Sequence, residues 1–173
     1  MTEEQFDVVD ESDNVLFSAP RSEVHARRWL HRAAHIFVFN SRGELLVHRR
    51  SATKDEYPLR YNSSASGHLH AGEDYSPAAV RELEEELGLT GELEFLHKFP
   101  ASAETSYEHT VLYRMTTDAT PRFDPEEIES GAYYSLPTLS EWIARRPDDF
   151  TPCFLTLFGW YLAQFPYTDG ALP

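Results

Sequence analysis

Cysteine is almost absent from this sequence. The chain has 173 residues and one cysteine, Cys153. One thiol excludes an intrachain disulfide framework and a zinc site built from several cysteines. The acidic N-terminal segment 1–13 also lacks the basic start and the apolar run of a signal peptide. Both features predict a cytoplasmic protein, because disulfide-rich chains are typical of oxidising compartments.

Long apolar runs and basic side chains are scarce as well. The longest apolar stretch, residues 154–165, is interrupted by Gly159 and Gln164 and is too short to span a membrane. Fifteen Lys and Arg stand against 29 Asp and Glu, which gives a formal net charge of −14. Nucleic-acid backbones are held mainly by Lys and Arg, so we expect no nucleic-acid polymer as partner. A small phosphate ester that carries its own cation is compatible with such a surface.

The composition is that of a globular protein, with 41% hydrophobic and 13% aromatic residues in a length that suits one domain. Residues 1–30 predict a hairpin followed by a helix, and residues 51–66 predict a loop. Alternating and helical patterns predict strands at 6–9, 15–17, 34–39, 44–49, 93–99, 105–116 and 132–135, and helices at 20–28, 76–87, 138–146 and 151–164. This mixture favours an α/β fold with a mixed sheet covered by helices.

The most informative segment is 67–89, GHLHAGEDYSPAAVRELEEELGL. Its helix is predicted to be capped by Ser76 and to end at Gly88, which can adopt the left-handed conformation. At helical spacing Val80, Leu83 and Leu87 share one face, which we expect to be buried against the sheet. The segment therefore predicts an amphipathic helix on one face of the sheet.

The other face of this helix carries clustered carboxylates. Glu82, Glu85 and Glu86 lie three and four positions apart, Arg81 borders them, and Glu73 precedes the helix. Like charges at this spacing repel by about 0.3 kcal/mol per pair. Mg²⁺ or Mn²⁺ can reverse that cost, because hard cations prefer carboxylate oxygens. The alternative is a solvated acidic face, which is the usual outcome for glutamates alone.

The spacing of the whole segment resembles the Nudix box. Every defined position of that pattern is matched, by Gly67, Glu73, Arg81, Glu82, Leu83, Glu85, Glu86, Gly88 and Leu89. The resemblance implies one Nudix domain over 1–173, with the Nudix-type α/β/α sandwich and its central mixed β-sheet. It also implies hydrolysis of a nucleoside diphosphate linked to another moiety, or of a nucleoside di- or triphosphate.

The same resemblance assigns roles to the box residues. It implies that Glu82, Glu85 and Glu86 hold Mg²⁺ or Mn²⁺, with support from Glu73 and Arg81. Such cations neutralise a diphosphate and lower the pKa of a bound water. Glu85 and Glu86 are the two candidates for accepting the water proton.

Charged residues outside the box give further candidates. Arg49, Arg50 and Lys54 follow a predicted strand and either clamp the diphosphate or are ordinary surface charges. Glu108 is a charged residue within the strand predicted at 105–116, where a purely apolar strand would have none. Its side chain is either exposed or close to the metals. Glu127 is a candidate because Nudix proteins often carry an acidic residue near the site at this point of the chain.

The short segments 8–11, 31–33, 37–40, 45–47, 49–50, 62–63 and 67–68 of the N-terminal half resemble the isopentenyl-diphosphate isomerase branch of the same superfamily. That likeness implies metal binding by His31 and His68, together with strand glutamates near Glu108. The isomerase also needs a cysteine immediately before its Gly-His pair, where this chain has Ser66. Serine is a poor substitute, because its pKa lies far above that of a thiol. We therefore favour a hydrolase with an isomerase-like N-terminal extension and keep the isomerase as the alternative.

Two further features bear on specificity and assembly. Leu59 stands in the 51–66 loop where the related pattern often has glycine. The aromatic side chains of the helix predicted at 151–164 either pack internally or form the contact in a homodimer. The expected partner is a small-molecule diphosphate, and the sequence does not rank the candidate substrates.

Overall fold

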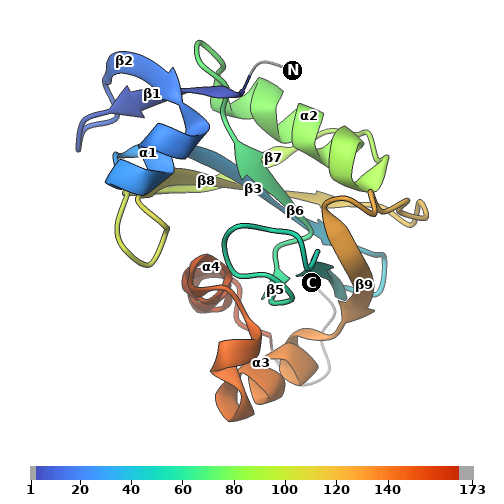
Figure 1. Cartoon of the computed structure of the whole chain (residues 1–173). Coiled ribbons are helices and arrows are strands. Elements are labelled where there is room, and N and C mark those ends of the chain that lie inside the picture. Colours follow the sequence, from blue (N-terminus) through green and yellow to red (C-terminus); the bar gives the residue numbers. More distant parts are fainter. Residues whose placement is uncertain (1–2, 168–173) are drawn as a thin grey trace.

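A mixed β-sheet lies between helices in the computed structural model, which describes residues 3–167 (Figure 1). Over this range the sheet has seven strands, with the order β5-β4-β3-β8-β7; β6 pairs with β3, and β9 with β4. β3 and β8 are parallel, and the other pairs are antiparallel. Their bounds are β3 His31–Phe39, β4 Leu45–Arg50, β5 Tyr61–Asn62, β6 Ala65–His68, β7 Glu94–Phe99, β8 Glu108–Thr116 and β9 Ile128–Tyr134.

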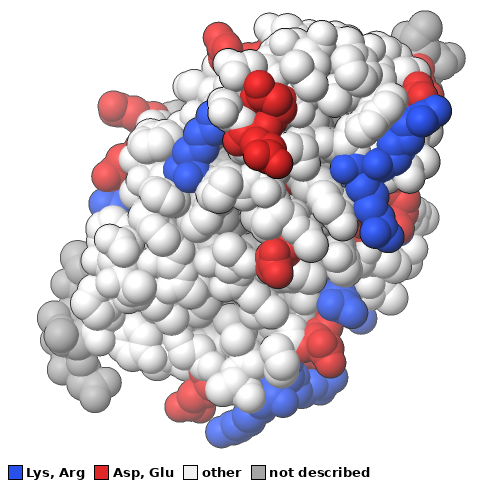
Figure 2. Space-filling model, turned by 90° about the vertical axis from the view of Figure 1, so that its left-hand side faces the viewer, with Lys and Arg blue, Asp and Glu red and all other residues white. Residues whose placement is uncertain are grey.

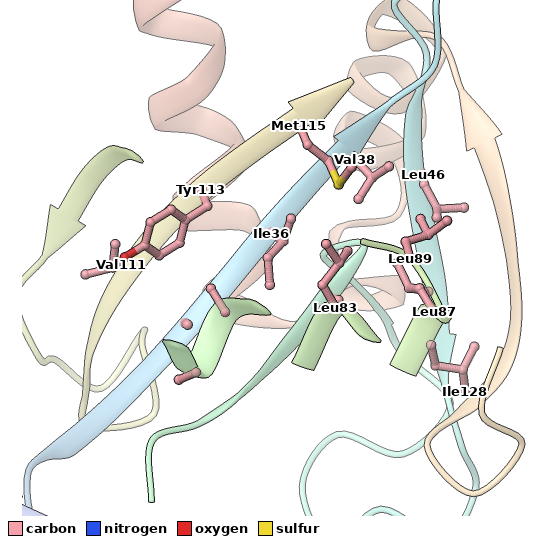
Figure 3. Close-up of a cluster of buried hydrophobic side chains, with 14 of the residues drawn as sticks. Ile36, Val38, Leu46, Leu83, Leu87, Leu89, Val111, Tyr113, Met115 and Ile128 are labelled. Carbon is pink, nitrogen blue, oxygen red and sulfur yellow. The ribbon is translucent and has the colours of Figure 1, made fainter. Parts of the chain in front are cut away.

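Helix α2 (Tyr75–Leu87) covers one face of the sheet, and α3 (Leu136–Arg145) and α4 (Pro152–Gln164) cover the other (Figure 1). Figure 3 shows Leu83 of α2 near Ile36 of β3, and Leu87 of α2 near Leu89 and Ile128, all in one buried cluster. Burial of such a side chain stabilises a fold by about 1.5–3 kcal/mol, so this interface holds α2 firmly on the sheet. The predicted α/β/α sandwich with a mixed sheet is confirmed.

The predicted orientation of α2 is wrong for Val80, which is 44% exposed. The arc of the helix that faces the sheet is centred near Leu83 and includes Glu86, so Val80 lies at its margin. The predicted end at Gly88 is confirmed, with a φ of 61°. The predicted cap at Ser76 is wrong: Asp74 is the N-cap, because its carbonyl already accepts the Ala78 N–H at 3.1 Å.

The loop predicted at 51–66 contains two short strands, β5 and the start of β6. Both are polar and have two and four residues, so they carry too little alternation to be recognised. The strand predicted at 105–116 begins only at Glu108, and the strand predicted at 132–135 begins at Ile128. The remaining elements differ from their predicted bounds by a few residues at most.

The N-terminal extension is a separate two-stranded sheet, β1 (Gln5–Val9) and β2 (Val15–Pro20), followed by α1 (Arg21–Arg27). Its turn is anchored to the main sheet, because Asp13 accepts a hydrogen bond from Arg32 Nε of β3 at 2.6 Å. Tyr75 of α2 donates a second bond to Asp13 at 2.9 Å. These contacts hold the β1–β2 turn against β3 and α2.

The aromatic side chains of α4 pack internally. Phe154, Phe158 and Tyr161 are buried against the sheet, in a cluster that includes Phe37. Among residues 3–167, no helix is both long and apolar enough to cross a membrane. Figure 2 shows one face of the molecule, on which the acidic side chains are separated by broad uncharged surface. The acidic groups of the site below are, by contrast, gathered in one pocket.

Candidate active site

A pocket of about 340 Å³ lies where α2, β6 and loop 51–60 meet. Its walls come from segments far apart in the sequence, which the sheet brings together. Acidic residues dominate the lining: Glu4, Asp55, Glu56, Glu82, Glu85, Glu86, Glu108, Asp124 and Glu127. Such a pocket attracts cations strongly and requires them to hold an anionic ligand.

Glu86 lies on the face of α2 that is turned toward the sheet, and it is only 4% exposed. One of its oxygens accepts a hydrogen bond from the Ser66 N–H at 3.0 Å. Burial raises the pKa of Glu86 well above its ordinary value, and the nearby Glu82 carboxylate adds to the shift. Burial also raises the pKa of Glu82, against the opposing charge of Arg81. A cation between these carboxylates would relieve both effects.

Gly67 of β6 lies directly against the Glu82 carboxyl group. A Cβ atom at this position would be 2.1 Å from Glu82 Cδ, far inside van der Waals contact. Only glycine therefore allows the strand to pass so close to this side chain. The first glycine of the 67–89 segment is explained by this approach.

Arg81 organises the neighbouring carboxylates. Its guanidinium donates two bonds to Glu73, at 3.0 and 2.8 Å, and one to the His68 carbonyl at 3.0 Å. It also donates to Glu82 at 2.6 Å and to Glu85 at 3.2 Å. Glu73 lies outside the pocket lining and acts through Arg81, whereas Glu82 and Glu85 line the pocket.

The three basic residues predicted to bind the diphosphate do not all lie in the pocket. Arg50 and Lys54 line the pocket, but Arg49 does not, and its Nε donates to the Leu59 carbonyl at 3.0 Å. Successive strand residues point to opposite faces, so Arg49 and Arg50 cannot both enter the pocket. Lys54 forms an ion pair with Glu127, which also lines the pocket.

Three histidines from separate elements meet beside the carboxylates. His25 of α1, His31 of β3 and His68 of β6 offer nitrogen atoms within 4.8 Å of one another. Glu108 completes the group: its Oε1 is 2.8 Å from His68 Nε2 and 3.5 Å from His31 Nε2. Within residues 3–167, the buried Nε2 atoms of His25 and His31 find no hydrogen-bond partner. The group therefore fits a metal ion.

Glu108 is 7% exposed, so the alternative that placed it on the strand surface is wrong. The parallel pairing of β3 with β8 places it opposite His31. The sequence spacing of the histidines shows no convergence and did not single out His25, because the three histidines meet only through the tertiary fold. Burial lowers the pKa of His25 to about 4, and the charges of His68 and His31 contribute. The neutral imidazole that results at pH 7 is the form that binds metals.

Ser66 and Cys153 both line the pocket. Ser66 Oγ accepts a hydrogen bond from Asn62 at 2.9 Å. Cys153 is buried, and its Sγ is 3.6 Å from His35 Nε2. Burial raises the pKa of the Cys153 thiol, which therefore stays protonated near neutral pH. The fold thus brings the single cysteine into the pocket despite its distance in sequence, but as a thiol and not a thiolate.

A sandwich that presents a carboxylate-bearing helix to a polar pocket defines a class of α/β enzymes acting on small molecules. The NUDIX domain family model matches residues 29–153, and this chain belongs to the Nudix family. The family and its hydrolase relatives support hydrolysis of a phosphoanhydride bond, and enzymes of this family generally use divalent metal ions.

Relatives carry both hydrolase and isomerase names. The chain is 33% identical to an isopentenyl-diphosphate Delta-isomerase of Serratia proteamaculans, over 90% of this chain and 89% of the relative. It is also 33% identical to an uncharacterized Nudix hydrolase of Yersinia pestis, over 93% and 87%. The crystal structure of DR0079 from Deinococcus radiodurans is similar, with a TM-score of 0.74 and 31% identity over 82% of this chain and 90% of that one. Overall likeness thus does not separate the two activities, and the site residues must do so.

Proposed function

We propose that this protein is a metal-dependent pyrophosphohydrolase that cleaves a nucleoside diphosphate linked to another moiety, or a nucleoside di- or triphosphate. One observation carries the proposal: Glu82 and Glu86 are both largely buried in one pocket. Glu86 has no ion-pair partner among residues 3–167. A buried carboxylate without a counter-charge, such as that of Glu86, is costly unless a cation binds it.

The residues present fit Mg²⁺ or Mn²⁺, which take oxygen ligands. Glu82, Glu85 and Glu86 would hold the cation, and Glu73 would support them by fixing Arg81. When bound, the cation would neutralise the phosphates and lower the pKa of the attacking water. Either Glu85 or Glu86 accepts the water proton.

Arg50 and Lys54 are the basic residues that can reach the phosphates from loop 51–60 and the end of β4. Arg49 is engaged outside the pocket, so we leave it out of the proposed binding set. The partner that follows from this site is a small diphosphate. A cytoplasmic location and a homodimer stay predictions.

The test is product release from a panel of nucleotides with Mg²⁺ or Mn²⁺. Glu86→Gln should reduce turnover by about 100-fold or more, because it removes a charge from the site. Glu84→Gln is the matched control, since Glu84 lies on the same helix but is exposed and outside the pocket. Equal turnover of the two variants would overturn the proposal.

The second candidate is the isomerase, which the histidine group favours and Ser66 opposes. Incubation with isopentenyl diphosphate in D₂O distinguishes the two, because isomerisation incorporates deuterium at carbon. We expect no incorporation by the native chain. Incorporation at the rate of product formation would make the isomerase the better assignment.

We also propose that His25, His31, His68 and Glu108 hold an accessory metal ion. Co²⁺ bound through imidazoles gives visible absorption bands, which should weaken in His25→Ala. His97→Ala is the control, because His97 stacks on Trp160 away from the group. Identical spectra for both variants would remove this ion from the proposal.

A further inference from the structure

Lys54 spans part of the pocket to reach Glu127. The two side chains form an ion pair and are 18% and 36% exposed. The backbone brings them together, because the Ser51 N–H donates to the Glu127 carbonyl at 3.0 Å and the Lys54 N–H donates to the Ser51 carbonyl at 3.3 Å. Lys54 and Glu127 are thus held on one wall of the pocket, independently of their ion pair.

The Lys54 charge also acts on the carboxylates of α2. Burial and Glu82 raise the pKa of Glu86, and Lys54 is the cation that opposes them. Glu127 in turn contributes to the raised pKa of both Glu82 and Glu86. Lys54 and Glu127 also line the same pocket as Glu82 and Glu86, so the ammonium group lies in the pocket that contains the proposed cation site.

Each of the other cations of the pocket is held in place by one or more protein partners. Arg81 is fixed by Glu73, Glu82, Glu85 and the His68 carbonyl. Arg21 pairs with Glu4 and Asp55, each at 3.2 Å. Arg50 donates through Nε to the Glu56 carbonyl at 3.1 Å. Lys54 differs from them, because a single ammonium on a flexible chain can leave one partner for another.

We propose that Lys54 is an exchangeable counter-ion of this pocket. It neutralises Glu127 while the carboxylates hold no divalent cation, and it moves to the substrate's phosphate once a cation bound by the α2 carboxylates compensates the charge of Glu127 in its place. Its charge is paired in both states, so the exchange leaves no uncompensated charge in the pocket. Lys54 thereby opposes cation binding in the absence of substrate and favours it in the presence of substrate. This inference rests on the proposed function.

The test is calorimetric titration of the nucleotide-free protein with Mn²⁺. Lys54→Met should bind Mn²⁺ about tenfold more tightly, because the ammonium group that competes with the cation for the charge of Glu127 is removed. Lys54→Arg keeps the charge and should stay close to the native affinity. An unchanged Mn²⁺ affinity in Lys54→Met would overturn the proposal and leave Lys54 as a simple phosphate ligand, and a weaker affinity would overturn it in favour of a structural role.

A double variant tests the exchange with Glu127. In a Glu127→Gln background Lys54 has no carboxylate to release, so Lys54→Met should then change the Mn²⁺ affinity by much less than tenfold. The full tenfold gain in that background would contradict the exchange. Absence of Mn²⁺ binding in the native chain and in every variant would instead refute the metal-dependent function itself, a result distinct from equal affinities.

Discussion

Arg81 donates two parallel hydrogen bonds to Glu73: Nε is 3.0 Å from Oε1, and Nη2 is 2.8 Å from Oε2. The third nitrogen, Nη1, is 2.6 Å from Glu82. A planar guanidinium held at one edge is fixed in orientation, so it also fixes the carboxylate at its other edge. Glu73 thus positions Glu82 without touching it.

We predict that Arg81→Lys weakens the site although the charge is kept. Lysine cannot form the paired bonds to Glu73 and still reach Glu82. Loss of such a supporting contact lowers metal affinity or activity by about 10- to 100-fold. Mn²⁺ titration and kcat/KM measure the effect, with Arg145→Lys as control because Arg145 pairs, within residues 3–167, only with exposed Glu141. Equal losses in both variants would contradict the positioning role.

We predict that Gly67→Ala separates activity from stability. The added Cβ would meet Glu82 Cδ at 2.1 Å, so the carboxyl group must move. The carboxyl group must move by about 1 Å or more to restore van der Waals contact, and a misplacement of about 1 Å in a catalytic group costs about 100-fold in rate. The free energy of unfolding should change little, because the displaced group is the end of a flexible side chain. Turnover and urea denaturation of the same samples check both statements.

The control for Gly67→Ala is Gly159→Ala. Gly159 lies inside α4, where an added Cβ has no neighbour within 4 Å. Alanine there should stabilise the protein by up to about 1 kcal/mol, because glycine is the weaker helix former. Its turnover should stay at the native value. Native turnover in Gly67→Ala would show that Glu82 tolerates the new position.

Features that depend on interactions within one segment could be predicted from the sequence, whereas features that depend on contacts between distant segments could not. The helix end at Gly88 and the stacking of Glu82 with Glu86 depend on helical periodicity, which is visible within one segment. The convergence of His25 with His31 depends on how α1 docks against the sheet, and no local spacing encodes it. The burial of Glu108 likewise follows from the parallel register of β8 with β3.

The separation of Arg49 from Arg50 has a different cause. Strand alternation requires that one of them points away from the pocket, but which one depends on the registry of β4 in the sheet. The exposure of Val80 depends in the same way on a small rotation of α2. Local patterns therefore predicted the elements and the chemistry of the carboxylate helix, and tertiary packing determined which other side chains reach it.

We predict that Asp13 makes stability depend on pH. Burial would raise the pKa of its carboxyl group, but hydrogen bonds from Lys98, Arg32 and Tyr75 outweigh it and lower the pKa below the ordinary value. A lowered folded-state pKa means that the contribution is complete above the unfolded pKa and is lost as pH falls through the folded one. Asp13→Asn should therefore cost about 2–4 kcal/mol near pH 7, and this difference should shrink below about pH 4.

Urea denaturation at several pH values measures that difference. Asparagine suits the position, because Asp13 has a φ of 64° and asparagine tolerates the left-handed region. Asp148→Asn is the control, since Asp148 is exposed and forms no ion pair among the described residues. A cost for Asp13→Asn that is constant from pH 3 to pH 7 would contradict the ionic origin.

We predict that Leu59→Gly stabilises the protein. Leu59 has a φ of 61° and is 39% exposed, at the position where the related sequence pattern often has glycine. A left-handed conformation costs a branched side chain about 1–2 kcal/mol, whereas glycine adopts it freely and pays about 0.5–1 kcal/mol of chain entropy. The net gain should be about 0.5 kcal/mol in the free energy of unfolding. Leu59→Ala is the matched comparison: it removes the same exposed side chain but keeps a Cβ, so it should give no gain. Equal stabilities of the two variants would show that the loop bears no strain at this residue.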